Sequence, residues 1–313
     1  MRFGGSRTPY PTSISSRALI WFLTCHRHIS HFAMQSISLT AGEYHSALPN
    51  ITRQGRIIWG AFMQQYSSLA EFYDSLNFGC DYDSLADFLS SVIKENERTK
   101  SSLVLDLACG TGKLTFKLRE RGYDMTGVDM SENMLACAHN YAYENGIDDV
   151  LLLCQDMRGF ELYGTVDACV CTLDSINYLT KSEDVKKCFS LVHNYLIPEG
   201  VFVFDINTPY RFREIYAKND FILENDEALL AWQSTFNEKS GICKFYLSIF
   251  CEDENGKYDR YDEIQTERCY SKRKIEALLR ETGFEIISVY GDLNKKVATD
   301  TDEKWYFVCR CIK

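Results

Sequence analysis

The sequence of 313 residues predicts an α/β fold, in which a mostly parallel sheet carries helices on both faces and a separate antiparallel sheet is inserted. Two observations lead to this prediction. Short apolar runs of strand character alternate with segments of helical periodicity over most of the chain. Between about 207 and 270 the alternation stops, and three strand-like runs follow one another with no helix between them.

The first part of the α/β pattern runs to about residue 206. Apolar residues at helical spacing predict helices over 64–77, 82–96, 112–121, 131–145 and around 185–192. Ser131 has the residue type and position of an N-cap. Apolar runs predict strands over 103–107, 125–128, 150–154, 166–172 and 201–205.

The inserted part differs in its period. Runs at 229–237, 241–252 and 257–269 have strand spacing, and in the second Cys243, Phe245 and Leu247 alternate with mixed residues. The α/β pattern then resumes with a helix that Ser271 caps and Gly283 ends, followed by strands at 285–289 and 305–311. We therefore expect an α/β domain of residues 63–206 and 271–313, interrupted by a β insertion of residues 207–270.

Residues 1–62 differ in composition from the rest of the chain. They hold six arginines, no lysine and a single acid, Glu43. A mitochondrial-type targeting peptide has this composition, and a secretory signal would need a longer apolar core. We favour a third interpretation, an over-extended reading frame with translation starting at Met34 or Met63. In each case we expect a poorly ordered segment.

Composition limits the classes of function. The net charge of −10 and the pI near 5.2 disfavour a broad phosphate-binding surface, so nucleic acid is a disfavoured partner. No apolar run is long enough to span a membrane. The 13 cysteines include no Cys-x-x-Cys pair, which argues against a metal site, and runs such as 169–171 and 309–311 predict buried free thiols. Unpaired thiols indicate a reducing compartment, and we expect a cytoplasmic protein.

The most informative stretch is residues 104–112, VLDLACGTG. It predicts a buried strand that ends near Asp106 and turns into a helix through Gly110 and Gly112. Such a turn at the carboxyl end of a strand is typical of a nucleotide or nucleoside site. A dinucleotide site would have glycine or alanine at the position of Thr115, and the Asp106 carboxylate would repel a pyrophosphate. The same carboxylate would attract an ammonium group and favour a cationic sulfonium ligand.

Two further carboxylates follow later strands. Asp129 can accept hydrogen bonds from both hydroxyls of a ribose, a role that also exists in dinucleotide folds. Asp156 can take an adenine amino group, and Met157 can pack on the ring face. Each residue alone is compatible with a plain turn or helix cap. Together they favour S-adenosylmethionine as cofactor, with NAD as the weaker alternative.

Residues 63–313 resemble a class I S-adenosylmethionine-dependent methyltransferase. The resemblance rests on residues 104–112 (VLDLACGTG), 127–135 (GVDMSENML), 155–158 (QDMR) and 172–179 (TLDSINYL). The early helix with Tyr66, Ala70, Tyr73 and Asp74, and the β insertion, are similar to a bacterial small-molecule-type subgroup. The resemblance implies a Rossmann-like sheet of seven strands with the last antiparallel. It also implies that Tyr66 or Tyr73 closes over the cofactor.

The predicted cofactor site combines the residue-level reading with the resemblance. It comprises Asp106, Ala108, Gly110, Thr111, Gly112, Asp129, Met130, Asp156, Met157 and Leu173.

The sequence limits the methyl acceptor only to a broad chemical class. After the fourth strand, residues 172–175 (TLDS) lack the proline turn common in nucleobase amine methylation, which favours a small molecule with an N or O acceptor atom. We expect the insertion to cover the site and select this acceptor, in a monomer or homodimer. Arg211 could bind a carboxylate, or be a solvated surface residue. The candidate catalytic or acceptor-facing residues are Tyr66, Tyr73, Asp174, Asn177, Asn207, Arg211, Tyr261, Glu263, Gln265 and Glu267.

Two alternatives remain at this point. One is a non-catalytic protein that binds S-adenosylmethionine, and the other is a methyltransferase that acts on RNA. Because methyl transfer mainly needs alignment of the reacting atoms, the lack of an obvious catalytic group does not favour the non-catalytic alternative.

Overall fold

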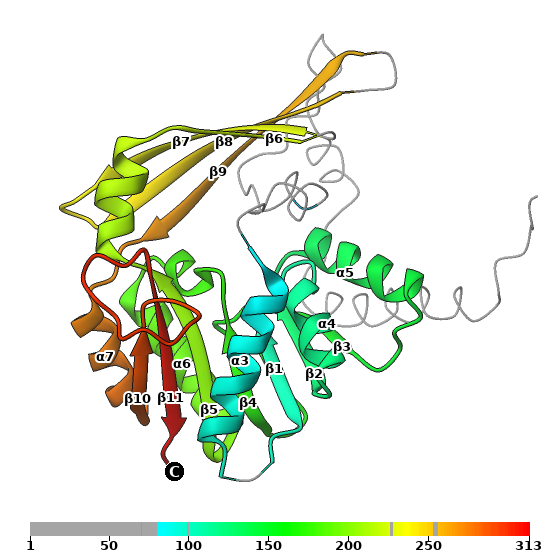
Figure 1. Cartoon of the computed structure of the whole chain (residues 1–313), viewed down its shortest axis with the longest axis vertical. Coiled ribbons are helices and arrows are strands. Elements are labelled where there is room, and N and C mark those ends of the chain that lie inside the picture. The colour runs from blue at the N-terminus through cyan, green and yellow to red at the C-terminus, as the bar shows by residue number, and fades with distance from the viewer. Residues whose placement is uncertain (1–69, 71–79, 99, 226–227, 253–255) are drawn as a thin grey trace, which may run out of the picture. The chain divides into compact units, whose positions relative to one another are not determined.

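The computed structural model describes residues 70, 80–98, 100–225, 228–252 and 256–313 (Figure 1). The chain divides into two units, residues 1–62 and residues 63–313. The predicted leader and, apart from the helical residue Ala70, the predicted helix over 64–77 lie outside the described residues.

Seven strands form the main sheet in the order β10-β11-β5-β4-β1-β2-β3. Neighbouring strands from β5 to β3 pair in parallel, and β11 is antiparallel to both β5 and β10. The strands are β1 (Leu103–Leu107), β2 (Asp124–Asp129), β3 (Leu151–Cys154), β4 (Val166–Cys171), β5 (Leu196–Asn207), β10 (Phe284–Tyr290) and β11 (Lys304–Cys311). The strand order reverses at β1 and β4, and ligands of open α/β sheets bind beside such a point.

Helices cover both faces of this sheet, as predicted. The helices are α3 (Tyr82–Asn96), α4 (Lys113–Glu120), α5 (Glu132–Glu144), α6 (Ser182–Tyr195) and α7 (Lys272–Glu281). Apolar residues of α3 and α4 pack on one face and those of α6 and α7 on the other. Ser131 and Ser271 cap α5 and α7, each accepting a backbone N–H of the first turn. The caps confirm the helix starts expected from the sequence.

The inserted sheet is antiparallel, in the order β6-β7-β8-β9 (Figure 1). Its strands are β6 (Phe221–Glu224), β7 (Ala228–Asn237), β8 (Ile242–Glu252) and β9 (Tyr258–Arg268). The sequence predicted the three longer strands and missed β6, because a four-residue edge strand is too short to show a period. It also missed the helical turns at Arg211–Ile215 and Tyr216–Lys218.

The insertion has an apolar core of its own. Phe212, Tyr216, Phe245 and Ile249 are buried in a cluster separate from the two clusters of the main sheet. Side-chain hydrogen bonds join strand β9 of the inserted sheet to the α/β domain. Asn177 donates to the carbonyl of Arg268 (2.9 Å), and Asn207 donates to Glu267 (3.0 Å). In the described ranges, no helix is long and apolar enough to span a bilayer.

Candidate active site

The candidate residues lie around two neighbouring cavities of different size. The smaller cavity lies over the carboxyl ends of β1, β2 and β4. Eight of the predicted cofactor residues line it: Asp106, Ala108, Gly110, Thr111, Asp129, Met130, Met157 and Leu173. Ala108 and Leu173 have positive φ angles (62° and 56°), an unusual conformation for residues with a side chain. Such strain gathers where surrounding structure holds a functional turn in place. The turns after β1 and β4 are both of this kind.

Asp106 is the most buried carboxylate of this cavity. Its side chain accepts a hydrogen bond from the Thr115 hydroxyl (2.6 Å), and the residue is 2% exposed. Burial raises the pKa of the Asp106 carboxyl to about 7; the hydrogen bond from Thr115 opposes this rise and the nearby Asp129 adds to it. A cationic group in the cavity would favour the ionised carboxylate. Thr115, which is incompatible with the dinucleotide pattern, therefore anchors Asp106.

Asp129 ties the first turn to the second. Its two oxygens accept the backbone N–H groups of Gly110 and Ser131, both at 2.8 Å. Burial raises the pKa of Asp129, and these two hydrogen bonds lower it. Each carboxylate oxygen has a second lone pair for a further donor. The arrangement suits a ligand that presents two hydroxyls.

Two predicted cofactor residues do not line the smaller cavity. Gly112 stands at the start of α4 with a φ of 77°. A Cβ there would lie 2.8 Å from the Phe116 ring, so this turn needs a glycine. Asp156 forms an ion pair with Arg158, which lowers the pKa of Asp156. The structure thus brings Met157 to the cavity, while the carboxylate of Asp156 faces Arg158.

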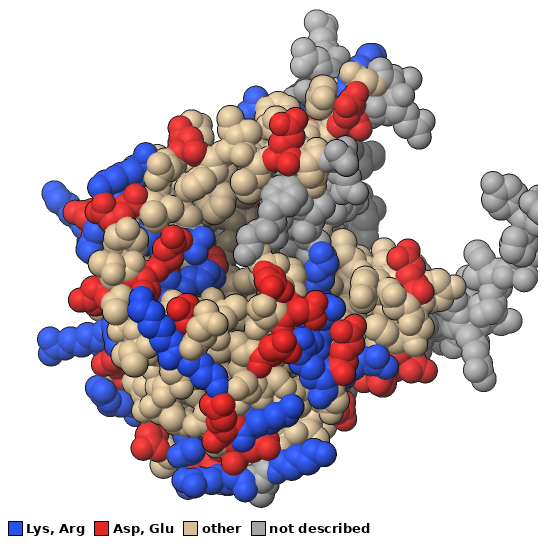
Figure 2. Space-filling model, in the orientation of Figure 1, with Lys and Arg blue, Asp and Glu red and all other residues tan. Residues whose placement is uncertain are grey.

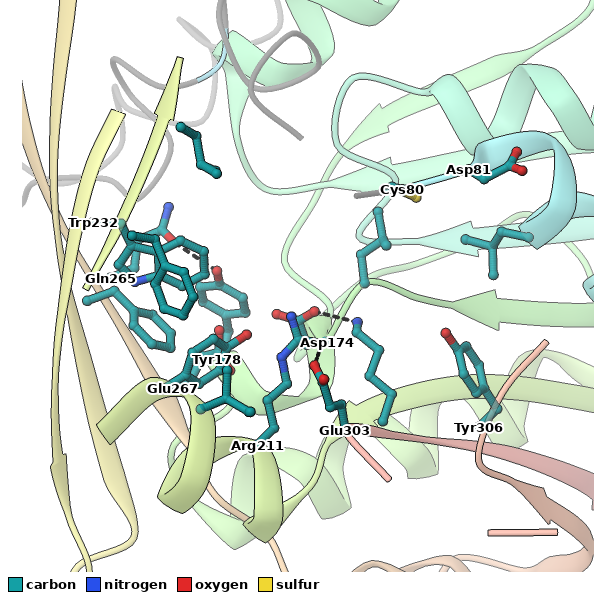
Figure 3. Close-up of a pocket in the computed structure, with 18 of the residues that line it drawn as sticks. Cys80, Asp81, Asp174, Tyr178, Arg211, Trp232, Gln265, Glu267, Glu303 and Tyr306 are labelled. Atoms are coloured by element: carbon teal, nitrogen blue, oxygen red, sulfur yellow. Dashed lines mark hydrogen bonds and ion pairs between the residues drawn. The ribbon is translucent and has the colours of Figure 1, made fainter. Parts of the chain in front are cut away.

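A larger cavity of about 800 Å³ adjoins the smaller one, with which it shares Leu173 and Tyr178. Its apolar wall comes from the insertion, where the rings of Trp232 and Phe245 pack edge to face with centroids 5.3 Å apart. Figure 3 shows Trp232 and Gln265 on one side of the cavity and Tyr306 on the other, with Asp174 between them. The volume is in the range of small-molecule sites.

A charged cluster lies at the centre of the larger cavity. The Lys304 ammonium donates to Asp174 (2.7 Å) and to Asp205 (2.6 Å). Burial is the largest influence on the pKa of Asp174 and would raise it, but the charges of Lys304 and Arg211, together with hydrogen bonds from Lys304 and Glu267, hold the pKa below its usual value. Asp174 also has a positive φ of 57°, and its backbone N–H donates to Asp205 (3.1 Å). The cluster therefore fixes Asp174 as a carboxylate.

Glu267 forms the second half of a carboxyl pair. It is 2% exposed, accepts from Asn207 and shares a hydrogen bond with Asp174. Burial, with the Asp174 charge adding to it, raises the pKa of Glu267 well above its usual value. Environments that separate two carboxyl pKa values assign them different protonation states. Here burial moves the pKa of Glu267 upward, while the nearby cations move that of Asp174 downward.

The other candidate residues are distributed as follows. Arg211 and Gln265 line the larger cavity with Asp174 and Glu267. Asn177 and Asn207 are fully buried, and Asn207 donates its N–H to Asn177 (2.9 Å), so both act in joining the two sheets.

On β9, Glu263 is buried and accepts from Gln265, while Tyr261 is 40% exposed. Glu263 and Tyr261 are not among the described residues that line either cavity. Tyr66 and Tyr73 lie outside the described residues.

Several cavity residues escaped the sequence analysis. Lys304 stands one position before the predicted last strand, where a charged residue gave no apolar signal. Tyr178 lay inside a recognised motif without an assigned role, and its hydroxyl donates to Gln265 (2.8 Å). Within the described ranges, no group of three or more His, Cys, Asp or Glu side chains could hold a metal ion.

Comparison with known proteins identifies the family. Residues 104–200 match the family described as a methyltransferase domain. The putative methyltransferase YqeM of Bacillus subtilis is 32% identical over 246 residues, which cover 77% of this chain and 95% of that protein. The crystal structure of an S-adenosylmethionine-dependent methyltransferase from Clostridium acetobutylicum has a TM-score of 0.72 and 32% identity, covering 79% of this chain and 99% of the other. The chain belongs to the class I S-adenosylmethionine-dependent methyltransferases.

A more distant relative of this methyltransferase has a named substrate. The glycine/sarcosine N-methyltransferase of Halorhodospira halochloris is 26% identical over 254 residues, which cover 75% of this chain and 85% of the relative.

The cofactor is S-adenosylmethionine, and the side chains that line the smaller cavity suit its chemical groups. The buried Asp106 carboxylate suits its cationic end, and Asp129 offers two oxygens to its ribose. Met157 and Leu173 offer apolar surface to a flat ring. We therefore retain these four residues as the predicted cofactor contacts.

Proposed function

We propose that this methyltransferase moves a methyl group to an N or O atom of a small molecule bound in the larger cavity. The main support for this function is that the two cavities share two lining residues, Leu173 and Tyr178. A group bound in one can therefore face a group bound in the other. In this arrangement the smaller cavity holds the cofactor and the larger one the acceptor.

The bound cofactor supplies a methyl group on a positively charged sulfur. The chain supplies alignment and exclusion of water, which are the main requirements of an in-line displacement. Leu173 and Asp174 follow shortly after β4 and have positive φ angles, a conformation that the surrounding structure must hold in place. The aromatic residues of the insertion cover the larger cavity and keep its far side dry.

Two further observations support a small acceptor over RNA. Acidic and basic side chains are mixed over the face shown in Figure 2, with no broad basic surface along which a phosphate backbone could lie. The glycine/sarcosine N-methyltransferase among the relatives acts, by its name, on small amino acids. A monomer or homodimer in the cytoplasm stays a prediction.

Incubation with isotope-labelled methyl donor tests this proposal. The protein is mixed in parallel with a metabolite extract and with total RNA, and the label is followed by mass spectrometry. We expect label in a small molecule, above the level of a variant carrying Asp129→Ala. Label confined to RNA would contradict the proposal, and cofactor binding without any transfer would favour a non-catalytic binding protein.

A further inference from the structure

We propose that the acceptor is an amine with an apolar, ring-containing body, bound as an ammonium ion against Asp174 and packed on the aromatic wall of the insertion. This inference rests on the proposed function and narrows its acceptor to one chemical class. It draws on the charge balance of the larger cavity, on the apolar wall opposite it, and on the movement of charge during methyl transfer.

The charge balance at the centre of the cavity leaves one carboxylate in excess. Asp174, Asp205 and Glu303 face the two cations Lys304 and Arg211, and the pKa of Glu267 lies well above its usual value. The Asp205 side chain is 1% exposed, whereas that of Asp174 is 21% exposed. The excess negative charge therefore faces the cavity at Asp174.

The two cations that line the cavity are already paired. Lys304 lies between its two carboxylates, and Arg211 lies 3.6 Å from Glu303 and 5.2 Å from the Tyr216 ring centroid. Among the described lining residues, the carboxyl groups other than Glu267 still outnumber the cations Arg211 and Lys304; they are Asp81, Asp174, Asp292 and Glu303. A phosphate or a carboxylate on the acceptor would thus meet net negative charge, which disfavours it.

The opposite wall is apolar and aromatic. Trp232, Phe245, Phe221 and Leu230 line it, and the Phe221 and Trp232 rings lie 5.2 Å apart. A flat or branched apolar body gains contact area on such a wall. Trp232 Nε1 and Arg211 Nε are buried donors without a partner among the described residues, so each can donate to a neutral oxygen on that body.

The transfer step gives Asp174 a function. The acceptor ammonium first releases a proton to solvent, which reaches the cavity beside the half-exposed Glu303. The nitrogen lone pair then forms the new N–C bond, while the S–C bond of the donor breaks and its electron pair stays on sulfur. Positive charge thus moves from sulfur to nitrogen, toward Asp174. A fixed carboxylate stabilises charge that develops beside it, and the methylammonium product keeps the charge of the bound substrate.

Lys304 and Glu267 are each held from the buried side: Lys304 donates to Asp205, and Glu267 accepts from Asn207. They are positioning residues that orient the Asp174 carboxylate. Asn tolerates a positive φ about as well as Asp, so Asp174→Asn removes the charge and keeps the backbone.

Binding of three matched probes tests the charge assignment. Tryptamine, tryptophol and indole-3-propionate share a ring and end in an ammonium, a hydroxyl and a carboxylate. Calorimetry is done with the full chain saturated with S-adenosylhomocysteine. We expect tryptamine to bind at least about tenfold more tightly than the other two, and Asp174→Asn to remove that preference while tryptophol binds as before. Asp149→Asn, at a surface pair with Arg119, is the matched control and should change nothing.

The inference is overturned if the carboxylate binds as tightly as the amine, if all three bind equally, or if none binds at millimolar concentration. Cofactor affinity and melting temperature of Asp174→Asn show that the variant is folded.

The labelled product separates this inference from the proposed function. A labelled small molecule that is an N-methylated amine supports both. A labelled small molecule methylated on oxygen, or one that bears a phosphate, overturns the amine inference and upholds the proposed function. Label in RNA alone overturns both.

Discussion

The two cavities of this methyltransferase are built from different kinds of chain segment. The smaller one is formed within residues 82–178, mainly by turns at the carboxyl ends of parallel strands. The larger one gathers Asp174, Arg211, Glu267 and Lys304 from four separate elements and adds an aromatic wall from the insertion. The first therefore depends on backbone turns that belong to the sheet itself. The second depends on how the insertion and the last strand pack, so under the proposed function the acceptor site can change while the turns of the smaller cavity stay intact.

Removal of the insertion should have the largest effect, because it should abolish the function of the larger cavity and leave that of the smaller one. Replacing residues 208–269 by a short linker deletes the aromatic wall of the larger cavity and no residue that lines the smaller one. We expect methyl transfer to be abolished and S-adenosylmethionine still to bind, as measured by labelled product and by calorimetry. Transfer to the true acceptor by the shortened protein would contradict the role of the insertion.

Lys304→Met should have the next largest effect. The change leaves Asp174 and Asp205 buried without their shared cation, which costs about 3 to 5 kcal/mol of folding free energy at neutral pH. Urea denaturation measures the loss. Lys186→Met breaks an exposed pair with Glu281 and should cost less than about 1 kcal/mol. Equal losses in the two variants would show that the cluster contributes no more than a surface pair.

Cofactor binding should depend on pH through Asp106. Its pKa of about 7 means that the carboxylate is mostly protonated below that pH, and only the ionised form attracts a cation. We expect the affinity for S-adenosylmethionine to rise about five- to tenfold between about pH 6 and about pH 7.5. Asp106→Asn should flatten this part of the profile. A parent profile as flat as that of the variant would argue against contact between Asp106 and the cofactor.

The smallest effect concerns the cap of α5 beside the smaller cavity. Ser131→Ala removes a side-chain acceptor for the Met134 N–H and should cost about 1 kcal/mol of stability. Cofactor affinity should change little, because the Ser131 backbone N–H still donates to Asp129. Ser271→Ala, which removes the corresponding cap of α7, is the matched control for stability. A much larger loss of cofactor affinity in Ser131→Ala would show that the hydroxyl itself contacts the ligand.

The sequence predicted the smaller cavity because its chemistry is local. Asp106, Gly110 and Gly112 lie within seven residues of one another, and Asp129 ends the next strand. Parallel strands bring such ends together without further information. Asp156 is the instructive exception, because its ion pair with Arg158, two residues on, is a side-chain choice that a strand pattern does not contain.

The larger cavity could not be predicted in the same way. Lys304 meets Asp174 across 130 residues only because β11 pairs antiparallel with β5, with Lys304 opposite Asn207. Strand periodicity places Tyr261, Glu263, Gln265 and Glu267 on one face of β9, and from the sequence alone that face could point into the cleft or be an exposed polar face. Its burial depends on packing of the insertion, and Glu263, Gln265 and Glu267 proved to be buried. Long-range register and burial therefore decide the larger cavity, and periodicity alone does not fix them.

The division of labour between the cavities is tested most directly by one pair of calorimetric titrations with S-adenosylmethionine. Asp129→Ala removes the acceptor of two backbone N–H groups and the proposed acceptor of the ribose hydroxyls, and should weaken binding about 100-fold. Asp174→Asn, in the larger cavity, should weaken it less than about threefold. Equal losses in the two variants, or no loss in Asp129→Ala, would contradict the assignment of cofactor and acceptor to separate cavities.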